Sequence, residues 1–233
     1  MAFIAGAGAT NIDLLYENMP KIPDMGEEVY TNSFSLQLGG GLPATLINLG
    51  RLGIDARIAT ELGNDMFSVF AKEQFEKNNV SPTNLYSGND IPLNITSAII
   101  LKNDRSFITY GKGTIDPDDK AEEEFYSIAK GAKICLMAPG GFLEVYKKLK
   151  SEGTVMVLDM GWDDDLTFEK YSELLSIADY YTPNQKEALK ITGCNNAKDA
   201  AYALKKYFDK VVVKVDKDGC IGIDGDEYFF CPS

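Results

Sequence analysis

The 233-residue sequence predicts an α/β fold, in which a mostly parallel sheet is covered by helices on both faces and carries a small appended β-sheet. From about residue 120 onward, amphipathic helix-like stretches alternate with short apolar runs. Such alternation is typical of parallel sheets. The chain is 45% hydrophobic and 25% charged, which is close to the average for folded proteins, so it can bury a substantial core. Two hairpin-like regions in the first half depart from the alternation and predict the appended sheet.

The elements of the first half are predicted from local patterns. Pro43 suits a first helical turn and Gly53 suits a helix end, so a helix is expected between them. A polar tripeptide at 102–104 joins two runs of β-forming residues, which is typical of a hairpin. The expected strands are 2–8, 28–38, 54–60, 96–101 and 105–110, and the expected helices are 44–52 and 66–78.

The second half follows a regular order of helix and strand. Helices are expected at 121–129, 142–151, 168–177, 185–192 and 197–208, and strands at 133–138, 154–159, 180–182 and 210–215, with a hairpin at 220–230. We expect residues 1–233 to form a single domain, with the appended sheet built from segments near 14–37 and 91–113. Phe34, Leu36, Ile99 and Phe107 are candidates for one apolar face of that sheet.

Composition excludes several classes of function. The 35 acidic and 23 basic residues give a formal net charge of −12, which disfavours nucleic acid and anionic membranes as partners. Histidine is absent, which excludes Ser-His-Asp catalysis and His-ligated zinc. No apolar run approaches the ~18 residues of a membrane helix, and there is no signal-peptide pattern. The four cysteines form no C-x-x-C pair, so a cytoplasmic protein is expected.

Two glycine-rich segments allow either a structural or a binding role. The segment from Gly6 to Asn11 partly resembles a dinucleotide-binding fingerprint, but Asn11 stands at the third glycine position. It predicts either a tight turn or, as a weaker alternative, an NAD site. The run Gly39–Gly41 precedes a predicted helix and could admit a ligand to backbone N–H groups or act as a hinge.

Four polar residues lie beside predicted strand ends. Asp13 follows the first strand and Asp159 closes a later one, where parallel sheets bind ligands, although solvated loop carboxylates are the alternative. Asn184 and Glu187 have the spacing of a capping box at a helix start. The same pair could instead order a hydrated Mg²⁺ ion near phosphates.

A series of motifs in one order resembles the PfkB, or ribokinase-like, family of sugar and nucleoside kinases. The resemblance spans essentially the whole chain, and the N-x-x-E element of Thr182–Glu187 is its most specific part. The other segments are Pro23–Glu28, Gly39–Gly41, Gly50–Gly53, Gly63–Asp65 and Val211–Val215.

The resemblance implies a fold and a reaction. The fold would be a three-layer α/β/α sandwich with a β-sheet lid that closes over the sugar and commonly forms a homodimer contact. The reaction would transfer the γ-phosphate of ATP to a hydroxyl of a sugar or nucleoside with the help of Mg²⁺. Two alternatives remain open: a non-catalytic sugar- or nucleotide-binding relative, and, more weakly, a dinucleotide-binding oxidoreductase.

The resemblance also implies roles for individual residues. Asn184 and Glu187 resemble the pair that organises magnesium and phosphate, Glu187 acting through water. The predicted substrate-binding residues are Asn11, Asp13, Gly39, Gly40 and Asp159, and the predicted nucleotide-binding residues are Asn184, Lys214, Asp216 and Gly219.

The sequence departs from the family pattern at four places. The family's D-x-N-x-R pattern after the middle strand reads Asp159-Met160-Gly161-Trp162 here, without the asparagine and arginine. Ala44 stands where the family has a sugar-contacting asparagine, and Asp216 stands where it has a glycine. The C-terminal G-A-G-D segment, whose aspartate is the family's catalytic base, is absent, so the base is expected beyond Ser233. We therefore expect a domain incomplete at its C-terminus and without turnover of its own, either a truncated form or a natural short one.

Overall fold

The structure is a computed structural model that describes residues 2–208 and 210–233. The chain forms two compact units. The first, here called the large-sheet unit, contains Met1–Ala7 and Pro117–Ser233. The second, the small-sheet unit, contains Gly8–Asp116.

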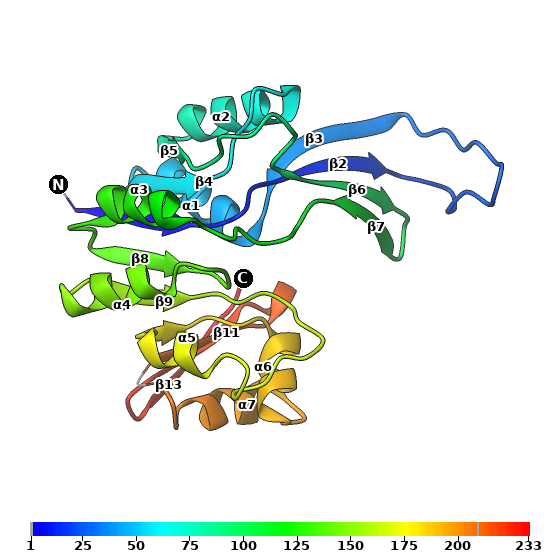
Figure 1. Cartoon of the computed structure of the whole chain (residues 1–233). Helices are drawn as coiled ribbons and strands as arrows, with labels where there is room; N and C mark the ends of the chain where they lie inside the picture. Colours follow the sequence, from blue (N-terminus) through cyan, green and yellow to red (C-terminus); the bar gives the residue numbers. More distant parts are fainter. Residues whose placement is uncertain (1, 209) are drawn as a thin grey trace. The chain divides into compact units, whose positions relative to one another are not determined.

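The large-sheet unit is built on strands that are mostly parallel (Figure 1). Their order is β13-β12-β11-β10-β9-β8-β1, with parallel pairing from β1 to β11 and antiparallel pairing of β12 and β13. The bounds are β1 (Phe3–Ala7), β8 (Ile134–Met137), β9 (Val155–Leu158), β10 (Tyr180–Tyr181), β11 (Lys210–Lys214), β12 (Cys220–Asp224) and β13 (Glu227–Cys231).

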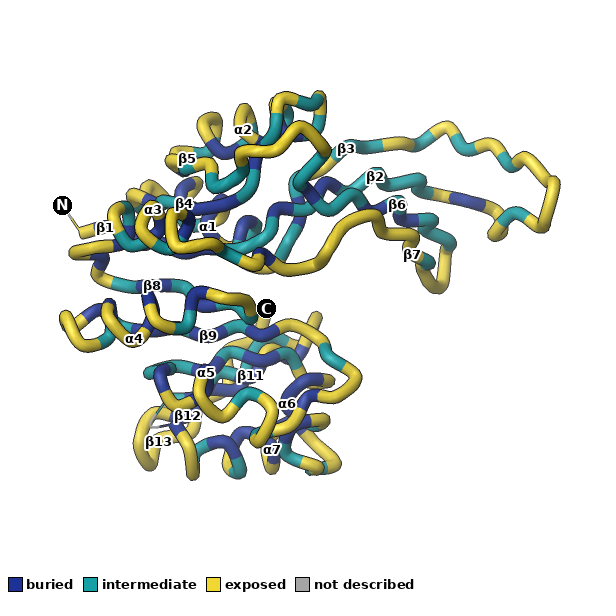
Figure 2. Tube along the Cα trace, in the orientation of Figure 1, coloured by how far each residue is buried: buried dark blue, intermediate teal, exposed yellow. Residues whose placement is uncertain are grey.

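Two groups of helices pack against this sheet. The helix α3 (Asp119–Ala129) contacts β1, and α4 (Leu143–Ser151) contacts β8 and β9, with α5 (Ser172–Ile177) beside α4. The second group contains α6 (Gln185–Thr192) and α7 (Ala197–Leu204), which pack on each other and on β11. All residues of β1 and alternate residues of β8 and β9 are buried, so these strands lie in the core of the unit (Figure 2). This arrangement confirms the predicted α/β fold with a parallel sheet.

The small-sheet unit contains the separate sheet that the hairpin-like regions predict. Its strands are β2 (Asn11–Glu17), β3 (Ser33–Gly39), β6 (Asn94–Ile100) and β7 (Arg105–Tyr110), in the order β3-β2-β6-β7. β2 pairs with β6 in parallel, and the two outer pairings are antiparallel. The unit also contains α1 (Gly41–Arg51), β4 (Asp55–Thr60), α2 (Met66–Lys77) and β5 (Val80–Asn84), with β4 and β5 parallel.

Register gives the small sheet one apolar and one polar face. Tyr16, Phe34 and Ile99 are paired neighbours on the apolar face, and the Tyr16 and Phe34 rings lie 5.3 Å apart. Leu36 shares that face, as predicted. Phe107 does not, because it pairs with Ala98 and therefore points to the opposite, polar face. The prediction for Phe107 was wrong because a hairpin register cannot be read from composition alone.

Several other expectations differ from the structure. The strand expected at 28–38 spans Ser33–Gly39, and the helix expected at 197–208 ends at Leu204. The helix expected from residue 168 begins at Ser172, because Asp163 accepts hydrogen bonds from both Lys170 and Tyr171 and holds the preceding segment in a turn. The strand β5 was not predicted, and it contains Pro82, a residue that is rare in strands. Within the described part of the chain, no helix is long and apolar enough to cross a membrane.

Candidate active site

The first group of site residues lies where three neighbouring strands of the large-sheet unit end. Asp159 follows β9, Asn184 follows β10, and Lys214 is the last residue of β11. Because β9, β10 and β11 are parallel neighbours, their carboxyl ends share one edge of the sheet. Local hydrogen bonds fix the chain there. Thr182 donates its backbone N–H and its hydroxyl to the Leu158 carbonyl, at 2.9 and 3.1 Å. The Lys214 N–H donates to the Pro183 carbonyl at 2.9 Å.

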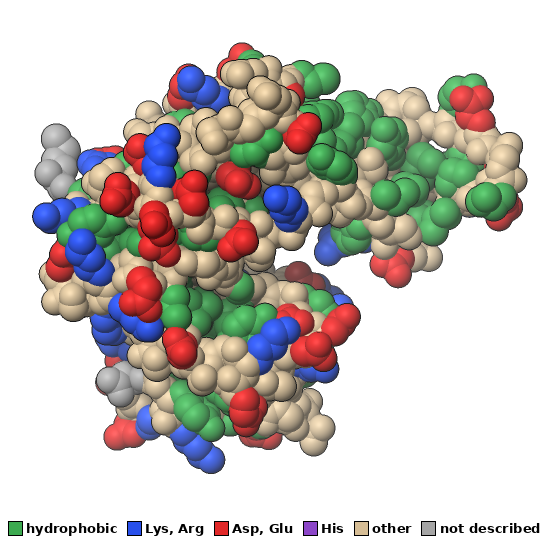
Figure 3. Space-filling view, in the orientation of Figure 1, with side chains coloured by type: hydrophobic (Ala, Val, Ile, Leu, Met, Phe, Trp, Pro, Cys, Tyr) green, Lys and Arg blue, Asp and Glu red, His purple; other side chains and the backbone are tan. Residues whose placement is uncertain are grey.

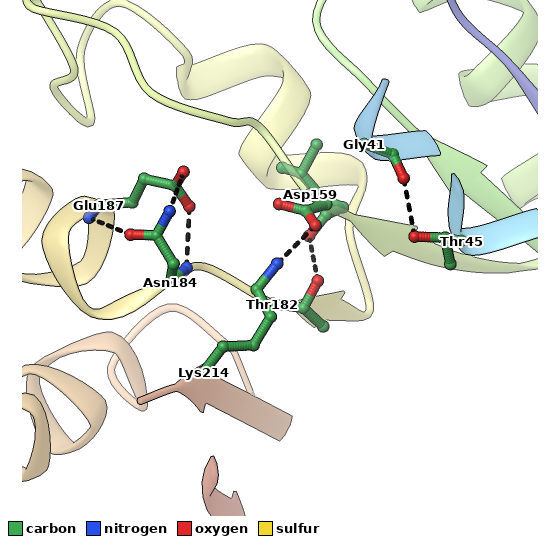
Figure 4. A network of polar contacts seen from close by, with 8 residues as sticks. Gly41, Thr45, Asp159, Thr182, Asn184, Glu187 and Lys214 are labelled. Atoms are coloured by element: carbon green, nitrogen blue, oxygen red, sulfur yellow. Dashed lines mark hydrogen bonds and ion pairs between the residues drawn. The ribbon is translucent and has the colours of Figure 1, made fainter. Parts of the chain in front are cut away.

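An ion pair connects two of these strand ends. The Lys214 ammonium lies 2.6 Å from Oδ2 of Asp159, although the residues are 55 positions apart (Figure 4). The two side chains are 46% and 37% exposed. A pair this exposed contributes little to stability, about 0–1 kcal/mol. The ammonium can therefore exchange its carboxylate partner for another anion at small cost.

Asn184 and Glu187 form a complete capping box at the start of α6. The Asn184 side chain accepts from the Glu187 N–H at 3.0 Å, and Glu187 Oε2 accepts from the Asn184 N–H at 2.8 Å. The second carboxylate oxygen accepts from the Asn184 amide at 2.5 Å, so both oxygens face the asparagine (Figure 4). The structural interpretation of this pair is therefore confirmed, and it fixes the direction in which the carboxylate points.

Burial and a neighbouring negative charge nevertheless disfavour the charged form of the Glu187 carboxylate. The residue is 3% exposed. Burial raises its pKa above the ordinary value, the hydrogen bond from Asn184 opposes that rise, and the nearby Asp159 charge adds to it. Lys214 acts in the opposite direction. A cation at this strand edge would therefore relieve repulsion between two carboxylates.

The chemistry of Asn184 and Glu187 would suit a magnesium site in which water and phosphate supply most of the ligands. No group of three or more Cys, Asp or Glu side chains gathers into a metal site anywhere in the described residues. Mg²⁺ commonly keeps several waters and binds through one or two carboxylates together with substrate phosphates. Glu187 and Asn184 fit that mode of binding, in which most ligands come from water and phosphate, better than an all-protein cage.

The loop after β11 holds the other two predicted nucleotide residues. Asp216 has φ +56°, in the left-handed region that favours glycine. Gly219 has φ +107°, and a Cβ there would collide with the Cys231 carbonyl. The Val215 N–H donates to the Gly219 carbonyl at 2.8 Å and closes the turn. The backbone conformation at Asp216 is thus the one that a glycine would adopt, although the residue is an aspartate.

Sequence reasoning missed Tyr181, the last residue of β10. Its hydroxyl is buried and has no hydrogen-bond partner among the described residues. Burial raises the pKa of this phenol, and the charges of Glu187 and Asp159 raise it further. The hydroxyl therefore lies within electrostatic range of both carboxylates. The sequence gives no signal for this position, because a tyrosine is an ordinary residue in a short strand and its distance from Glu187 and Asp159 depends on the fold.

The second group of site residues lies in the small-sheet unit. Asn11 and Asp13 project from the same face of β2, and the Asn11 amide donates to the Asp13 carboxylate. The carboxylate lies against Gly39, where any Cβ would collide with it. Burial raises the pKa of Asp13, whereas the Asn11 hydrogen bond lowers it. Asp13 is thus a half-buried acceptor whose position is fixed from two sides.

The glycine segment after β3 begins α1. Gly40 has φ +94° and is the residue before the first helical turn, with its carbonyl accepting from the Ala44 N–H at 3.0 Å. No side chain caps this helix. The first-turn N–H groups of α1 therefore have no side-chain acceptor. Both roles of this glycine segment, ligand contact and hinge, stay predictions.

The segment from Gly6 to Asn11 does not have the structure of a dinucleotide-binding fingerprint. A dinucleotide fingerprint requires its glycines to lead from a strand into a helix. The segment after β1 instead leads into β2, which begins at Asn11. The Gly8 N–H donates to the Ala59 carbonyl at 3.2 Å. The segment connects two strands, and the structural interpretation of its glycines, as part of a tight turn, is the one that the structure supports.

Comparison with known proteins identifies the family. The sequence profile of the pfkB family of carbohydrate kinases matches residues 1–233. The chain belongs to this family. It is 25% identical over 246 residues to a bifunctional ribokinase/ribose-5-phosphate isomerase A of Fructilactobacillus sanfranciscensis, covering 100% of this chain and 44% of that protein. It is 21% identical over 231 residues to mouse ribokinase, covering 94% of this chain and 69% of that protein. This pfkB-family chain thus spans less than half of the first relative's length.

Solved structures of the family share the fold. Arabidopsis thaliana ribokinase, complexed with ribose and ATP, superimposes with a TM-score of 0.80 at 20% identity, covering 100% of this chain and 78% of that one. Escherichia coli phosphofructokinase-2, in its tetrameric inhibited form, gives a TM-score of 0.73 at 17% identity, covering 100% and 80%. These likenesses confirm the ribokinase-like fold, with a large mostly parallel sheet and a smaller separate sheet.

Proposed function

We propose that this pfkB-family chain binds a sugar or nucleoside and ATP as part of a kinase that transfers the γ-phosphate to a substrate hydroxyl. The observation that carries the proposal is the group formed by Asp159, Asn184, Glu187 and Lys214 at one strand edge of the large-sheet unit. A lysine held by an exchangeable ion pair beside a helix start is suited to phosphate.

The nucleotide role rests on Lys214 and the loop that follows it. Lys214 would leave Asp159 for a phosphate oxygen, and the backbone turn closed by Gly219 would border the nucleotide. Bound Mg²⁺ would offset the negative charge of the phosphates. Asn184 and Glu187 would hold waters of that ion.

The sugar role rests on the small-sheet unit. Asp13 has one oxygen engaged by Asn11, which leaves the other free to accept hydrogen bonds from hydroxyl groups. Gly39 leaves room beside this carboxylate, and Gly40 permits the turn into α1. An acidic acceptor of this kind suits a polyhydroxylated substrate and disfavours an anionic group at the same position.

Calorimetry with ATP·Mg²⁺ tests the nucleotide role. Lys214→Ala should raise the ATP Kd about tenfold, because a charge-assisted hydrogen bond to phosphate is worth at least ~1.5 kcal/mol. Lys210→Ala is the matched control, because Lys210 lies at the other end of β11 and also pairs with a carboxylate, that of Asp224 at 3.0 Å. Equal ATP affinity of the two variants, or no ATP binding by the wild-type chain, would contradict the proposal.

The sugar role has a separate test with D-ribose as the first probe of a sugar panel. Asp13→Asn should raise the sugar Kd about tenfold and leave the ATP Kd unchanged, since it removes one charge-assisted acceptor. Glu17→Gln, on the same face of β2, is the control. A panel in which no sugar binds the wild-type chain would argue against this half of the proposal.

Assembly and location belong to the same proposal. Phe34, Ile108 and Tyr110 share the apolar face of the small sheet and are 55%, 69% and 56% exposed. Figure 3 shows hydrophobic side chains gathered over this sheet. We propose that the sheet acts as a lid and that a second copy covers its apolar face in a homodimer, because a face of this kind is costly to leave in water. A cytoplasmic location remains the expectation from the sequence.

A further inference from the structure

A directional hydrogen-bond chain crosses the polar face of the small sheet. Register places Thr109 of β7 opposite Thr96 of β6, and Thr96 opposite Asp13 of β2. The Thr96 hydroxyl donates to Oδ1, the side-chain amide oxygen of Asn11, at 3.1 Å, and the two threonine hydroxyls lie 3.0 Å apart. Since the Thr96 proton is used toward Asn11, Thr109 donates to Thr96. The chain therefore runs from Thr109 through Thr96 and Asn11 to the Asp13 carboxylate.

Thr96 determines how the Asn11 amide is oriented. An amide has one accepting and one donating end, and its hydrogen bonds decide which end points where. With its oxygen held by Thr96, Asn11 presents its NH₂ group to Asp13. Thr96 is 8% exposed, so bulk water cannot readily replace its hydroxyl. Thr109 is exposed, and water can replace it.

Among the described residues, the Asp13 carboxylate has no charged side chain close to it on this face of the sheet. It is half-buried and lies against Gly39. The other charged side chains on this face of the sheet, Glu17 and Arg105, lie four or more residues along the strands, or roughly 13 Å away. The hydrogen bond from Asn11 is therefore the main local interaction that stabilises the charge of Asp13.

We propose that Thr96 is a positioning residue for sugar binding, which acts through the Asn11 amide to hold the Asp13 carboxylate charged and aimed at a substrate hydroxyl. The inference rests on the proposed sugar-binding role of Asp13. It adds two residues, Thr96 and Thr109, that make no contact of their own with the substrate. The effect should be graded, with buried Thr96 mattering more than exposed Thr109.

A carboxyl-carbon NMR titration tests the inference without any ligand. The Asp13 signal is assigned by its loss in Asp13→Asn. Thr96→Val, which removes the hydroxyl and keeps the shape, should raise the measured pKa of Asp13 by about 0.5 or more, because a less constrained Asn11 stabilises the carboxylate less. Thr96→Ser should restore the wild-type pKa. Ser97→Ala, on the opposite face of the same strand, should leave it unchanged.

Calorimetry with D-ribose provides the second readout. Thr96→Val should weaken ribose binding about five- to tenfold, Thr109→Val about twofold, and neither should change the ATP Kd. If wild-type chain fails to bind D-ribose, the proposed substrate fails, while the titration still decides the role of Thr96. An Asp13 pKa that is the same in Thr96→Val and wild type, or that Thr96→Ser does not restore, would overturn the inference. Should Thr96→Val not fold, Thr96→Ala, which also removes the hydroxyl, takes its place in both measurements, with the same results expected and the same results contradicting the inference.

Discussion

At the scale of single residues, Asp216 combines a strained backbone with a charge in the predicted nucleotide loop. Its φ of +56° is costly for any residue with a Cβ, by roughly 1 kcal/mol. Asp216→Gly should therefore stabilise the protein by up to about 1 kcal/mol, less the larger entropy of the unfolded glycine chain. It should also lower the ATP Kd, because it removes a carboxylate from the loop.

Urea unfolding measures the first effect and calorimetry the second. Asp218→Gly is the matched control, because Asp218 lies in the same short 3-10 helix but outside the left-handed region. That substitution should destabilise the protein by about 0.5–1 kcal/mol. Identical changes in the two glycine variants would show that the left-handed backbone of Asp216 carries no cost.

Glu187 provides a pH-dependent prediction at the same scale. Its pKa is raised in the folded protein, chiefly by burial. The folded state therefore holds this proton more tightly than the unfolded state. The stability that the protonated group contributes is complete below the ordinary pKa and is lost as pH rises through the raised one.

Substitution by glutamine makes this loss measurable. Glu187→Gln cannot titrate, so its stability relative to wild type should improve steadily as pH rises from about 4.5. Glutamine can still make one of the capping hydrogen bonds. The loss of unfolding free energy that does not depend on pH should therefore be no more than about 1 kcal/mol. Urea unfolding between pH 4 and 8 gives the curve, with Glu123→Gln on the exposed side of α3 as control. A constant difference across this range would contradict the raised pKa.

At the scale of elements, the two faces of the small sheet give a paired prediction about assembly. Phe34 and Phe107 are 55% and 56% exposed, but they lie on opposite faces. If the apolar face forms a homodimer, Phe34→Lys should give a monomer by sedimentation velocity at micromolar concentration, because a lysine in the interface would be desolvated. Phe107→Lys should remain dimeric. A wild-type monomer, or dissociation by Phe107→Lys alone, would contradict the proposed interface.

At the scale of the whole molecule, binding and turnover can be separated. No G-A-G-D segment occurs in residues 1–233, and the general base of the family is expected in that segment. Loss of a general base costs about 10²–10⁴-fold in rate. The 233-residue chain should therefore bind ATP·Mg²⁺ and sugar without measurable ADP release in a coupled assay. Robust phosphorylation of any sugar in the panel would contradict this and would favour a base within the chain.

Much of the large-sheet unit was predictable because its signals are local. Helix periods, apolar strand runs and the capping box at Asn184 each depend on a few neighbouring residues. The capping box that the spacing of Asn184 and Glu187 indicates is present in the structure. By contrast, Ser172 begins a helix four residues later than expected, because Asp163 holds side chains seven and eight residues away in a turn.

The sequence by itself therefore determined the α/β class, the family, and the positions of Asp13, Asn184, Glu187 and Lys214 as candidates. Only the tertiary structure decided which side chains are in contact with one another. Lys214 reaches Asp159 across 55 residues, and Thr96 reaches Asn11 across 85. It also decided the face on which Phe107 lies. The physical reason is that strand register and long-range pairing depend on the whole packed chain, and a shift of one residue exchanges the two faces of a sheet.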